Sequence, residues 1–223
     1  CVDAHLRVTG APASSLKAVP TPFLTARGDT AEGGEAGTLS SVATSVLTKL
    51  LYRARMARWD LLRAICTLAS HGITWGLGCD KALHRFIRYV NCMKDVMLRG
   101  HIGEKPSALQ LALFADNDLA GCQEMSRSTS GALLALAGPC SFFPLACHSK
   151  RQSCVSHSTA ESELVVADTA VRLFGLPAQE LWETVLSRSV RFELRDDNSA
   201  CVQVIRTGKN PAARHVGRTH RVQ

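Results

Sequence analysis

The sequence predicts an α/β domain that follows a small helical subdomain, and two observations lead to this prediction. Apolar residues recur at helical spacing between residues 41 and about 100, which indicates packed helices. From about residue 108, three strand-like runs are followed by a helix, a fourth strand and a further helix. Strands joined by turns pair antiparallel, whereas a helix between strands makes a crossover connection. With 223 residues, 46% of them hydrophobic, the chain can bury such a core.

Residues 1–40 are expected to form a flexible linker or extension. They are rich in Ala, Gly, Thr, Ser and Pro and show no sustained period. Residues 41–105 form the expected helical subdomain, and residues 106–223 form the α/β domain. The apolar faces of the predicted helices hold Val46, Leu50, Trp59, Ile65, Leu83, Phe86 and Ile87.

Each predicted strand of the α/β domain is an apolar run bounded by turn or polar residues. The first strand is "ALQLALFA", and the next two are "GALLALAG" and "CSFFPLACHS", which the turn signal Gly138-Pro139 separates. A long helix is predicted over "STAESELVVADTAVRLFG", where Ser158 and Glu161 have the form of a capping box. The fourth strand is the alternating run "VRFELRD". A short helix over "NSACVQVIRTG" is expected to end at Gly208.

Carboxylates stand where two of these strands are predicted to end. Asp116 and Asp118 follow the first strand, and Asp196 and Asp197 follow the fourth. If the two strands are neighbours in the sheet, their carboxylates lie close together. A solvated loop is the alternative explanation for such acids.

The long helix carries two glutamates that are predicted to face opposite ways. Glu163 has only apolar neighbours three, four, seven and eight positions further on, whereas Glu161 shares its face with polar residues. The two differ by ~200° around the axis at ~100° per residue. Glu161 is therefore expected to face solvent and Glu163 the core. A carboxylate near a core needs a partner or a metal.

Together these acids favour a metal site formed by Asp116, Glu163 and either Asp196 or Asp197. Clustered carboxylates repel one another unless cations lie between them. Carboxylate oxygens and bound water are the ligands that suit Mg²⁺ or Mn²⁺. Two such ions ~4 Å apart can activate water and stabilise the leaving oxygen in phosphodiester cleavage.

Four stretches resemble, in order, the ribonuclease H domain of copia-type retrotransposon Pol polyproteins. They are "LFADNDLAG", "SRSTSG", "HSKRQSCVSHSTAESEL" and "RDDNSA". The family forms are like SDADWAG, RRSTSGY, SSKKQ…STAEAEY and a motif led by DN. Upstream, "KLLYRARMARWDLLRAI" and "CDKALHRFIRYV" look like the segment that joins the reverse transcriptase to this domain. The resemblance covers roughly residues 45 to 223.

The resemblance implies a ribonuclease H-like mixed five-stranded sheet flanked by helices, and cleavage of the RNA strand of RNA–DNA hybrids with two Mg²⁺ or Mn²⁺ ions. The motifs place Asp116 and Glu163 as the first two catalytic and metal-binding acids. The third is Asp197 if "DN" is the anchor, whereas a gapless match to a DNQSA form selects Asp196. Asp118 and Asp196 are further candidate ligands. Integrase-like transferases are disfavoured, because they place their glutamate after both aspartates.

The chain departs from the family pattern at three points. Leu119 replaces a Trp, Leu164 replaces a Tyr, and Gln223 stands near the position of a fourth acid. We therefore keep an alternative, a catalytically inactive, truncated or decayed nucleic-acid-binding module of the same polyprotein. The chain is expected to be a fragment of that longer polyprotein.

Basic residues favour nucleic acid as the partner. The formal charge is +7 and the pI is about 9.1. Phosphate contacts position a duplex without reading its sequence. The candidate contacts are Lys150 and Arg151, expected in a turn, and Lys209, Arg214, His215, Arg218 and His220 near the C-terminal end.

The expected partners are an RNA–DNA hybrid and the upstream reverse transcriptase domain. No membrane is expected, because no apolar run reaches the ~18 residues of a membrane span. The nine cysteines are an odd number without a CxxC pair, which favours reduced thiols inside the cell. The expected location is a cytoplasmic virus-like particle or the nucleus.

Overall fold

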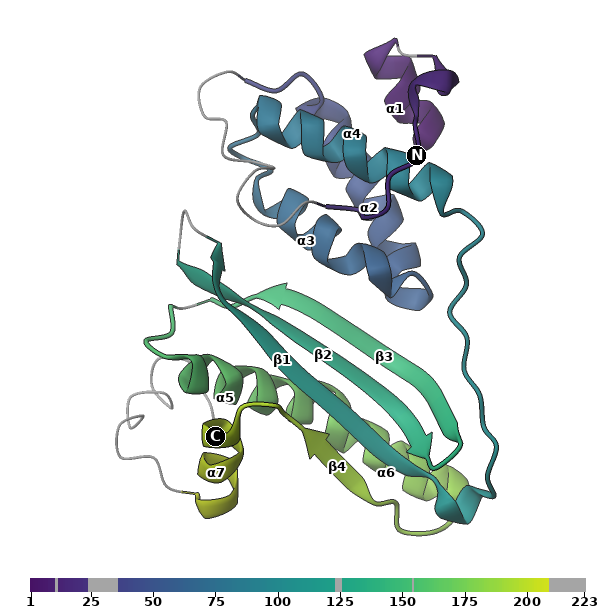
Figure 1. Cartoon of the computed structure of the whole chain (residues 1–223), viewed down its shortest axis with the longest axis vertical. Coiled ribbons are helices and arrows are strands. Elements are labelled where there is room, and N and C mark those ends of the chain that lie inside the picture. The colour runs from purple at the N-terminus through teal and green to yellow at the C-terminus, as the bar shows by residue number, and fades with distance from the viewer. Residues whose placement is uncertain (11, 24–35, 123–125, 154, 209–223) are drawn as a thin grey trace. The chain divides into compact units, whose positions relative to one another are not determined.

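The computed structural model describes most of the chain. The described residues are 1–10, 12–23, 36–122, 126–153 and 155–208. The chain divides into two compact units, Cys1–Leu98 and Arg99–Gln223, a few residues before the expected boundary after residue 105 (Figure 1). Within the described ranges, no helix is both long and apolar enough to cross a membrane.

The first unit is helical, as predicted for residues 41–105. Its helices are α1 (Val2–Thr9), α2 (Ser40–Met56), α3 (Leu62–Ser70) and α4 (Leu77–Cys92), with 3-10 turns at Ala13–Ser15 and Trp59–Leu61. Leu83, Phe86 and Ile87 are fully buried on one face of α4. The helical periodicity of this region therefore identified the buried face correctly.

The expectation of a flexible linker over residues 1–40 is wrong for the described part of that segment. Helix α1 buries His5 completely, and the His5 Nε2 atom lies 2.9 Å from His84 Nδ1 of α4. Leu16 and Val19 are also buried. Docking by a few single side chains leaves no periodic pattern in the sequence, so composition alone suggested a linker.

The second unit is a mixed α/β domain with an open sheet. Its strands are β1 (Gln110–Cys122), β2 (Arg127–Gly138), β3 (Ser141–Arg151) and β4 (Phe192–Arg195), after a 3-10 turn at Pro106–Ala108. The order across the sheet is β3-β2-β1-β4. The three strands β1 to β3 pair antiparallel, and β4 pairs parallel to β1. Both pairings confirm the prediction.

The sheet has four strands within the described residues, not the five that were expected. Helix α7 (Ser199–Thr207) is the last described element, and residues 209–223 lie outside the described ranges. A mixed sheet flanked by helices is therefore confirmed, while the fifth strand is not seen in the part that the structure describes.

Strand β1 is longer than predicted, and this changes the setting of its acids. It continues beyond Asp116, which pairs with Gly131, and Asp118, which pairs with Thr129. The apolar run ends near Ala115, but the backbone ladder with β2 continues. The two aspartates therefore lie within a strand instead of following it, because hydrogen bonding between backbones does not require apolar side chains.

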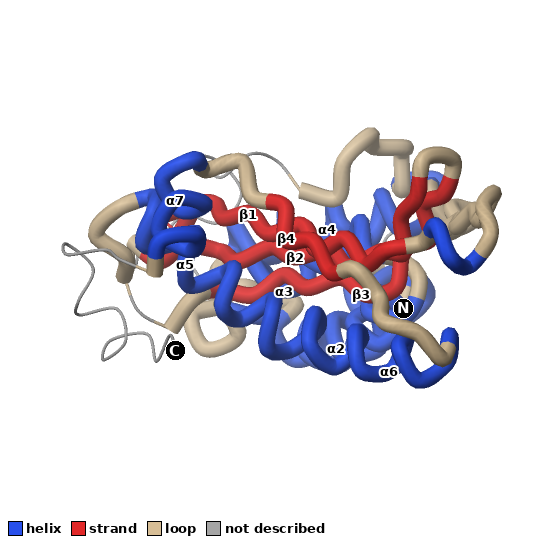
Figure 2. The backbone as a smooth tube through the Cα atoms, turned by 90° about the horizontal axis from the view of Figure 1, so that it is seen from below, coloured by secondary structure: helices blue, strands red, loops and turns tan. Residues whose placement is uncertain are grey.

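One face of the sheet is covered by a helical layer (Figures 1 and 2). The layer consists of α5 (Thr159–Ala170), a π-helical segment (Val171–Gly175) and α6 (Leu176–Leu186). The core beneath it contains Leu111, Leu113, Leu134, Leu136, Ala170 and Val190, with Phe174, Trp182 and Phe192 packed against them. This core fixes α5 against β1, and that contact positions the acids.

Candidate metal centre

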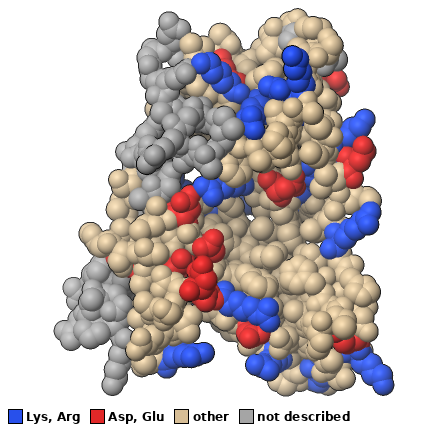
Figure 3. Space-filling model, in the orientation of Figure 1, with Lys and Arg blue, Asp and Glu red and all other residues tan. Residues whose placement is uncertain are grey.

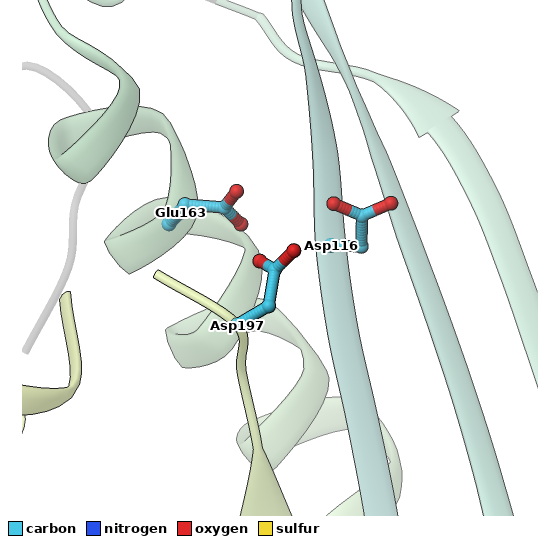
Figure 4. A group of neighbouring side chains, drawn as sticks. All are labelled: Asp116, Glu163 and Asp197. Carbon is cyan, nitrogen blue, oxygen red and sulfur yellow. The ribbon is translucent and has the colours of Figure 1, made fainter. Parts of the chain in front are cut away.

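Three carboxylates from three separate elements meet at one point of the second unit. Asp116 comes from β1, Glu163 from α5, and Asp197 from the connection between β4 and α7 (Figure 4). Each offers one ligand oxygen, and these oxygens all lie within 4.8 Å of one another. Asp116 and Asp197 are exposed, whereas Glu163 is only 3% exposed.

The parallel pairing of β4 with β1 brings the two aspartates together. Phe114 of β1 is in register with Arg195 of β4. Asp116 lies two residues beyond Phe114, and Asp197 lies two residues beyond Arg195. Both acids therefore lie at the same end of the paired segment, as the sequence predicted for neighbouring strands.

The residues around Asp197 fix the loop that carries it. The Asn198 side chain caps α7 by accepting a hydrogen bond of 3.0 Å from Cys201 N. Asp196 accepts a hydrogen bond of 2.8 Å from Asn198 N, which turns the chain at the helix start. Asp196 thus supports the loop through Oδ1, while its Oδ2 is buried and has no hydrogen-bond partner among the described residues. Asp197 is the aspartate that groups with Asp116 and Glu163.

The charges of this site act strongly on Glu163. Burial raises the pKa of the Glu163 carboxyl to about 7, and the negative charges of Asp196 and Asp116 add to this effect. The nearby Asn117 amide lowers the pKa, although its Nδ2 atom makes no hydrogen bond of normal geometry in the described structure. Figure 3 shows acidic side chains in one group on the viewed face, with Lys and Arg side chains dispersed around them.

The three side chains are a group that could hold a cation. The Glu163 Oε2 atom is buried and has no hydrogen-bond partner among the described residues. An anionic oxygen in that position is costly unless a cation, a proton or a hydrogen-bond donor compensates it. Carboxylate oxygens are suitable ligands for a hard divalent ion. The chemistry of the three side chains therefore fits a metal ion.

A buried polar network that the sequence analysis did not identify lies behind Glu163. Its hub is Gln152, whose Nε2 donates to Ser162 O at 3.1 Å and to Ser130 Oγ at 3.2 Å. Gln152 Oε1 accepts from Ser156 Oγ at 3.2 Å. Ser162 Oγ in turn donates to Asn117 Oδ1 at 2.8 Å. If the predicted first strand had included residues beyond Ala115, side-chain alternation along it would have placed Asn117 on the face toward α5.

The prediction that Glu161 faces solvent is wrong. Glu161 is 3% exposed, as buried as Glu163. Its Oε2 accepts a hydrogen bond of 2.9 Å from His157 N, and its own N–H donates to Ser158 Oγ at 3.2 Å. The Glu161 side chain reaches back to the backbone just before α5, so helical phase alone did not determine its burial.

The remaining predicted site residues have different placements. Asp118 lies further along β1 and is not in the group of three acids. Lys150 and Arg151 were expected in a turn but belong to the end of β3, in register with Ser130 and Thr129. The basic residues Lys209, Arg214, His215, Arg218 and His220 lie outside the described residues.

Comparison with known proteins gives no family for the chain. No model of a protein family matches it, and no curated protein is found to be similar.

Proposed function

We propose that this chain is a metal-dependent endonuclease that cleaves the RNA strand of RNA–DNA hybrids. One observation carries the proposal: Asp116, Glu163 and Asp197 each offer one ligand oxygen, and these oxygens all lie within 4.8 Å of one another. Such an arrangement is costly to keep without a cation and is expected where a cation has a role.

The resemblance to copia-type ribonuclease H domains supports the same reading. The motif "LFADNDLAG" supplies Asp116, "STAESEL" supplies Glu163, and "RDDNSA" supplies Asp197 if "DN" is its anchor. The three residues are distant in sequence, and they are the three acids whose ligand oxygens lie together. In this proposal the chain is part of a retrotransposon polyprotein, and a fifth strand would follow α7.

Each acid has a separate task in the proposed reaction. Bound Mg²⁺ or Mn²⁺ would supply activation of water and neutralisation of the charge that develops on the phosphate. Glu163 would hold the ion from the buried side, where it is fixed by α5. Asp116 and Asp197 are exposed and would hold it from the side that a substrate can reach. A bound ion would relieve the repulsion among the three carboxylates when all of them are ionised.

The proposed substrate contacts lie across the sheet from the acids. Lys150 pairs with Ser130, which pairs with Asn117 of β1, so Lys150 is two strands from the metal site. Two strand spacings are ~10 Å. A cation at this distance can contact a backbone phosphate of a duplex whose scissile phosphate lies at the acids.

The test is a panel of labelled duplexes with one sequence, prepared as RNA–DNA hybrid, DNA and RNA. The intact chain should cleave only the RNA strand of the hybrid and only with Mg²⁺ or Mn²⁺. Asp116→Asn should reduce this rate to background while the chain remains folded. Binding of the hybrid without turnover under any metal condition would reject the enzyme and favour a non-catalytic binding module.

A further inference from the structure

We propose that Asn117 is a positioning residue that holds the Glu163 carboxylate in the orientation that metal binding requires. The inference rests on the proposed function of the three acids as a metal site. It assigns a role to a residue that lies between two aspartates of β1 and is not itself a ligand.

Asn117 and Glu163 each have a buried polar atom without a hydrogen-bond partner among the described residues, one a donor and the other an acceptor. Asn117 Nδ2 is a hydrogen-bond donor, and Glu163 Oε2 is an acceptor. Both atoms are buried, and neither has a hydrogen-bond partner among the described residues. Each alone would cost free energy, because a buried polar group without a partner loses its hydration. A hydrogen bond between the two would remove both costs.

The orientation of the Asn117 amide is fixed from the other side. Ser162 Oγ donates to Asn117 Oδ1 at 2.8 Å, so the oxygen of the amide faces Ser162 and the nitrogen faces away from it. Ser162 is fully buried, and Gln152 Nε2 donates to its carbonyl oxygen at 3.1 Å. The amide is therefore held by a chain of buried hydrogen bonds that begins at Gln152.

This arrangement gives the two carboxylate oxygens of Glu163 different tasks. An N–H from Asn117 to Oε2 leaves the other oxygen for the ion. Residues that orient a metal ligand in this way commonly change metal affinity about 10–100-fold when they are removed. Asn117 would act through Glu163 and would not touch the substrate.

Binding of Mn²⁺ to the full chain without nucleic acid tests the proposal. The dissociation constant is measured by calorimetric titration for the wild type and for Asn117→Ala, with thermal unfolding of the metal-free proteins in parallel. We expect Asn117→Ala to weaken Mn²⁺ binding about ten-fold or more. In Asn117→Ala the Ser162 hydroxyl can still donate to Gln152 Oε1, which lies 3.4 Å away. This variant therefore does not leave the Ser162 hydroxyl without an acceptor.

Ser156→Ala is the matched control. It removes the hydrogen bond of 3.2 Å from Ser156 Oγ to Gln152 Oε1, which belongs to the same network but does not involve Asn117 or Glu163. A purely structural role predicts that both variants unfold at lower temperature and bind Mn²⁺ like the wild type. Positioning predicts that only Asn117→Ala loses affinity.

Ser162→Ala keeps the proposal testable if Asn117→Ala does not fold. It leaves the amide in place but removes the bond that orients it, so a smaller loss of Mn²⁺ affinity is expected. Wild-type affinity in either folded variant would overturn the role of Asn117 and leave the metal site intact. Absence of Mn²⁺ binding in the wild type would instead reject the metal site and, with it, this inference.

Discussion

At the scale of single residues, Glu163 carries most of the electrostatic cost of the site. The residue is only 3% exposed, and the pKa of its carboxyl is raised to about 7 by burial and by the charges of Asp196 and Asp116. In the metal-free protein Glu163 therefore keeps its proton between the ordinary glutamate pKa of 4.5 and about 7, a range in which a free glutamate is ionised. Proton and metal ion compete for the same oxygens.

The raised pKa predicts that the metal-free protein loses stability as pH rises. Between the ordinary value of 4.5 and about 7, the folded state binds more protons at Glu163 than the unfolded state does. This contribution is fully present below 4.5 and is lost as pH rises through 7, with a slope of at most about 1.4 kcal/mol per pH unit. Urea unfolding from pH 5 to pH 8 with a chelator measures it.

Glu163→Gln should flatten this part of the stability profile, because the amide does not titrate. Glu180→Gln, a change at an exposed glutamate of α6, is the control and should keep the wild-type slope. Equal slopes in the wild type and Glu163→Gln would contradict the protonated, buried state of Glu163.

Single residues also show how far the sequence could lead. The apolar neighbours of Glu163 placed it on the inner side of its helix. The predicted ends of two strands pointed to Asp116 and Asp118 and to Asp196 and Asp197, without deciding within each pair. The Glu161 carboxylate accepts a hydrogen bond from the backbone just before the helix, at His157 N, and helical phase alone does not show this local contact. Asn117 was missed because β1 was expected to end before it.

At the scale of elements, the start of α7 fixes the loop that carries Asp197. Asn198 caps the helix through its bond of 3.0 Å from Cys201 N. Backbone N–H groups at a helix start need such acceptors, and their loss costs about 0.5–2 kcal/mol. The parallel pairing of β4 with β1 then sets the loop beside Asp116.

Asn198→Ala should lower the free energy of unfolding by about 1 kcal/mol. Asn198→Ser is the matched control, because serine also caps helices well, and it should remain close to the wild type. Chemical denaturation of the three proteins measures the difference. Equal losses in both variants would show that the cap is not the relevant contact.

The close approach of the π-helical segment to β4 gives a second prediction at this scale. A Cβ atom on Gly175 would lie 2.6 Å from Phe192 Cζ and 2.8 Å from Cε2. Gly175→Ala should therefore destabilise the protein by about 1–3 kcal/mol through overpacking. The double variant with Phe192→Leu should recover part of the loss, which a double-mutant cycle would measure. Strict additivity would contradict the steric explanation.

Helices and strands could be predicted from the sequence where the apolar residues follow a regular helical or strand period. Helical periodicity located α4 and its buried face, and strand alternation located β4. The length of β1 was underestimated, because its polar second half is held by backbone pairing with β2. The π-helical segment has no separate sequence signal and merges with the predicted long helix.

At the scale of the whole molecule, the net charge of +7 favours an acidic partner. Binding of a duplex by phosphate contacts releases counterions, so the logarithm of the affinity falls linearly with the logarithm of the salt concentration. In the proposed function, the acidic site would serve catalysis, and the positive charge of the chain would serve binding of the duplex.

Hybrid binding by the intact chain should weaken steadily with salt in fluorescence anisotropy. Lys150→Ala should lower affinity on every sequence alike and reduce the salt slope by about one. Lys49→Ala, which changes an exposed lysine on α2, is the control. Salt-independent binding, or an unchanged slope in Lys150→Ala, would remove Lys150 from the proposed substrate contacts.

The most direct test of the central claim is the initial rate of hybrid cleavage across a Mn²⁺ titration, for the wild type and Glu163→Gln purified in the same way. We expect the wild-type rate to rise from zero with a chelator to a plateau at high Mn²⁺, and the folded Glu163→Gln protein to stay at background throughout. Equal rates in the two proteins, or cleavage in the presence of the chelator, would contradict a metal-dependent nuclease built on Asp116, Glu163 and Asp197.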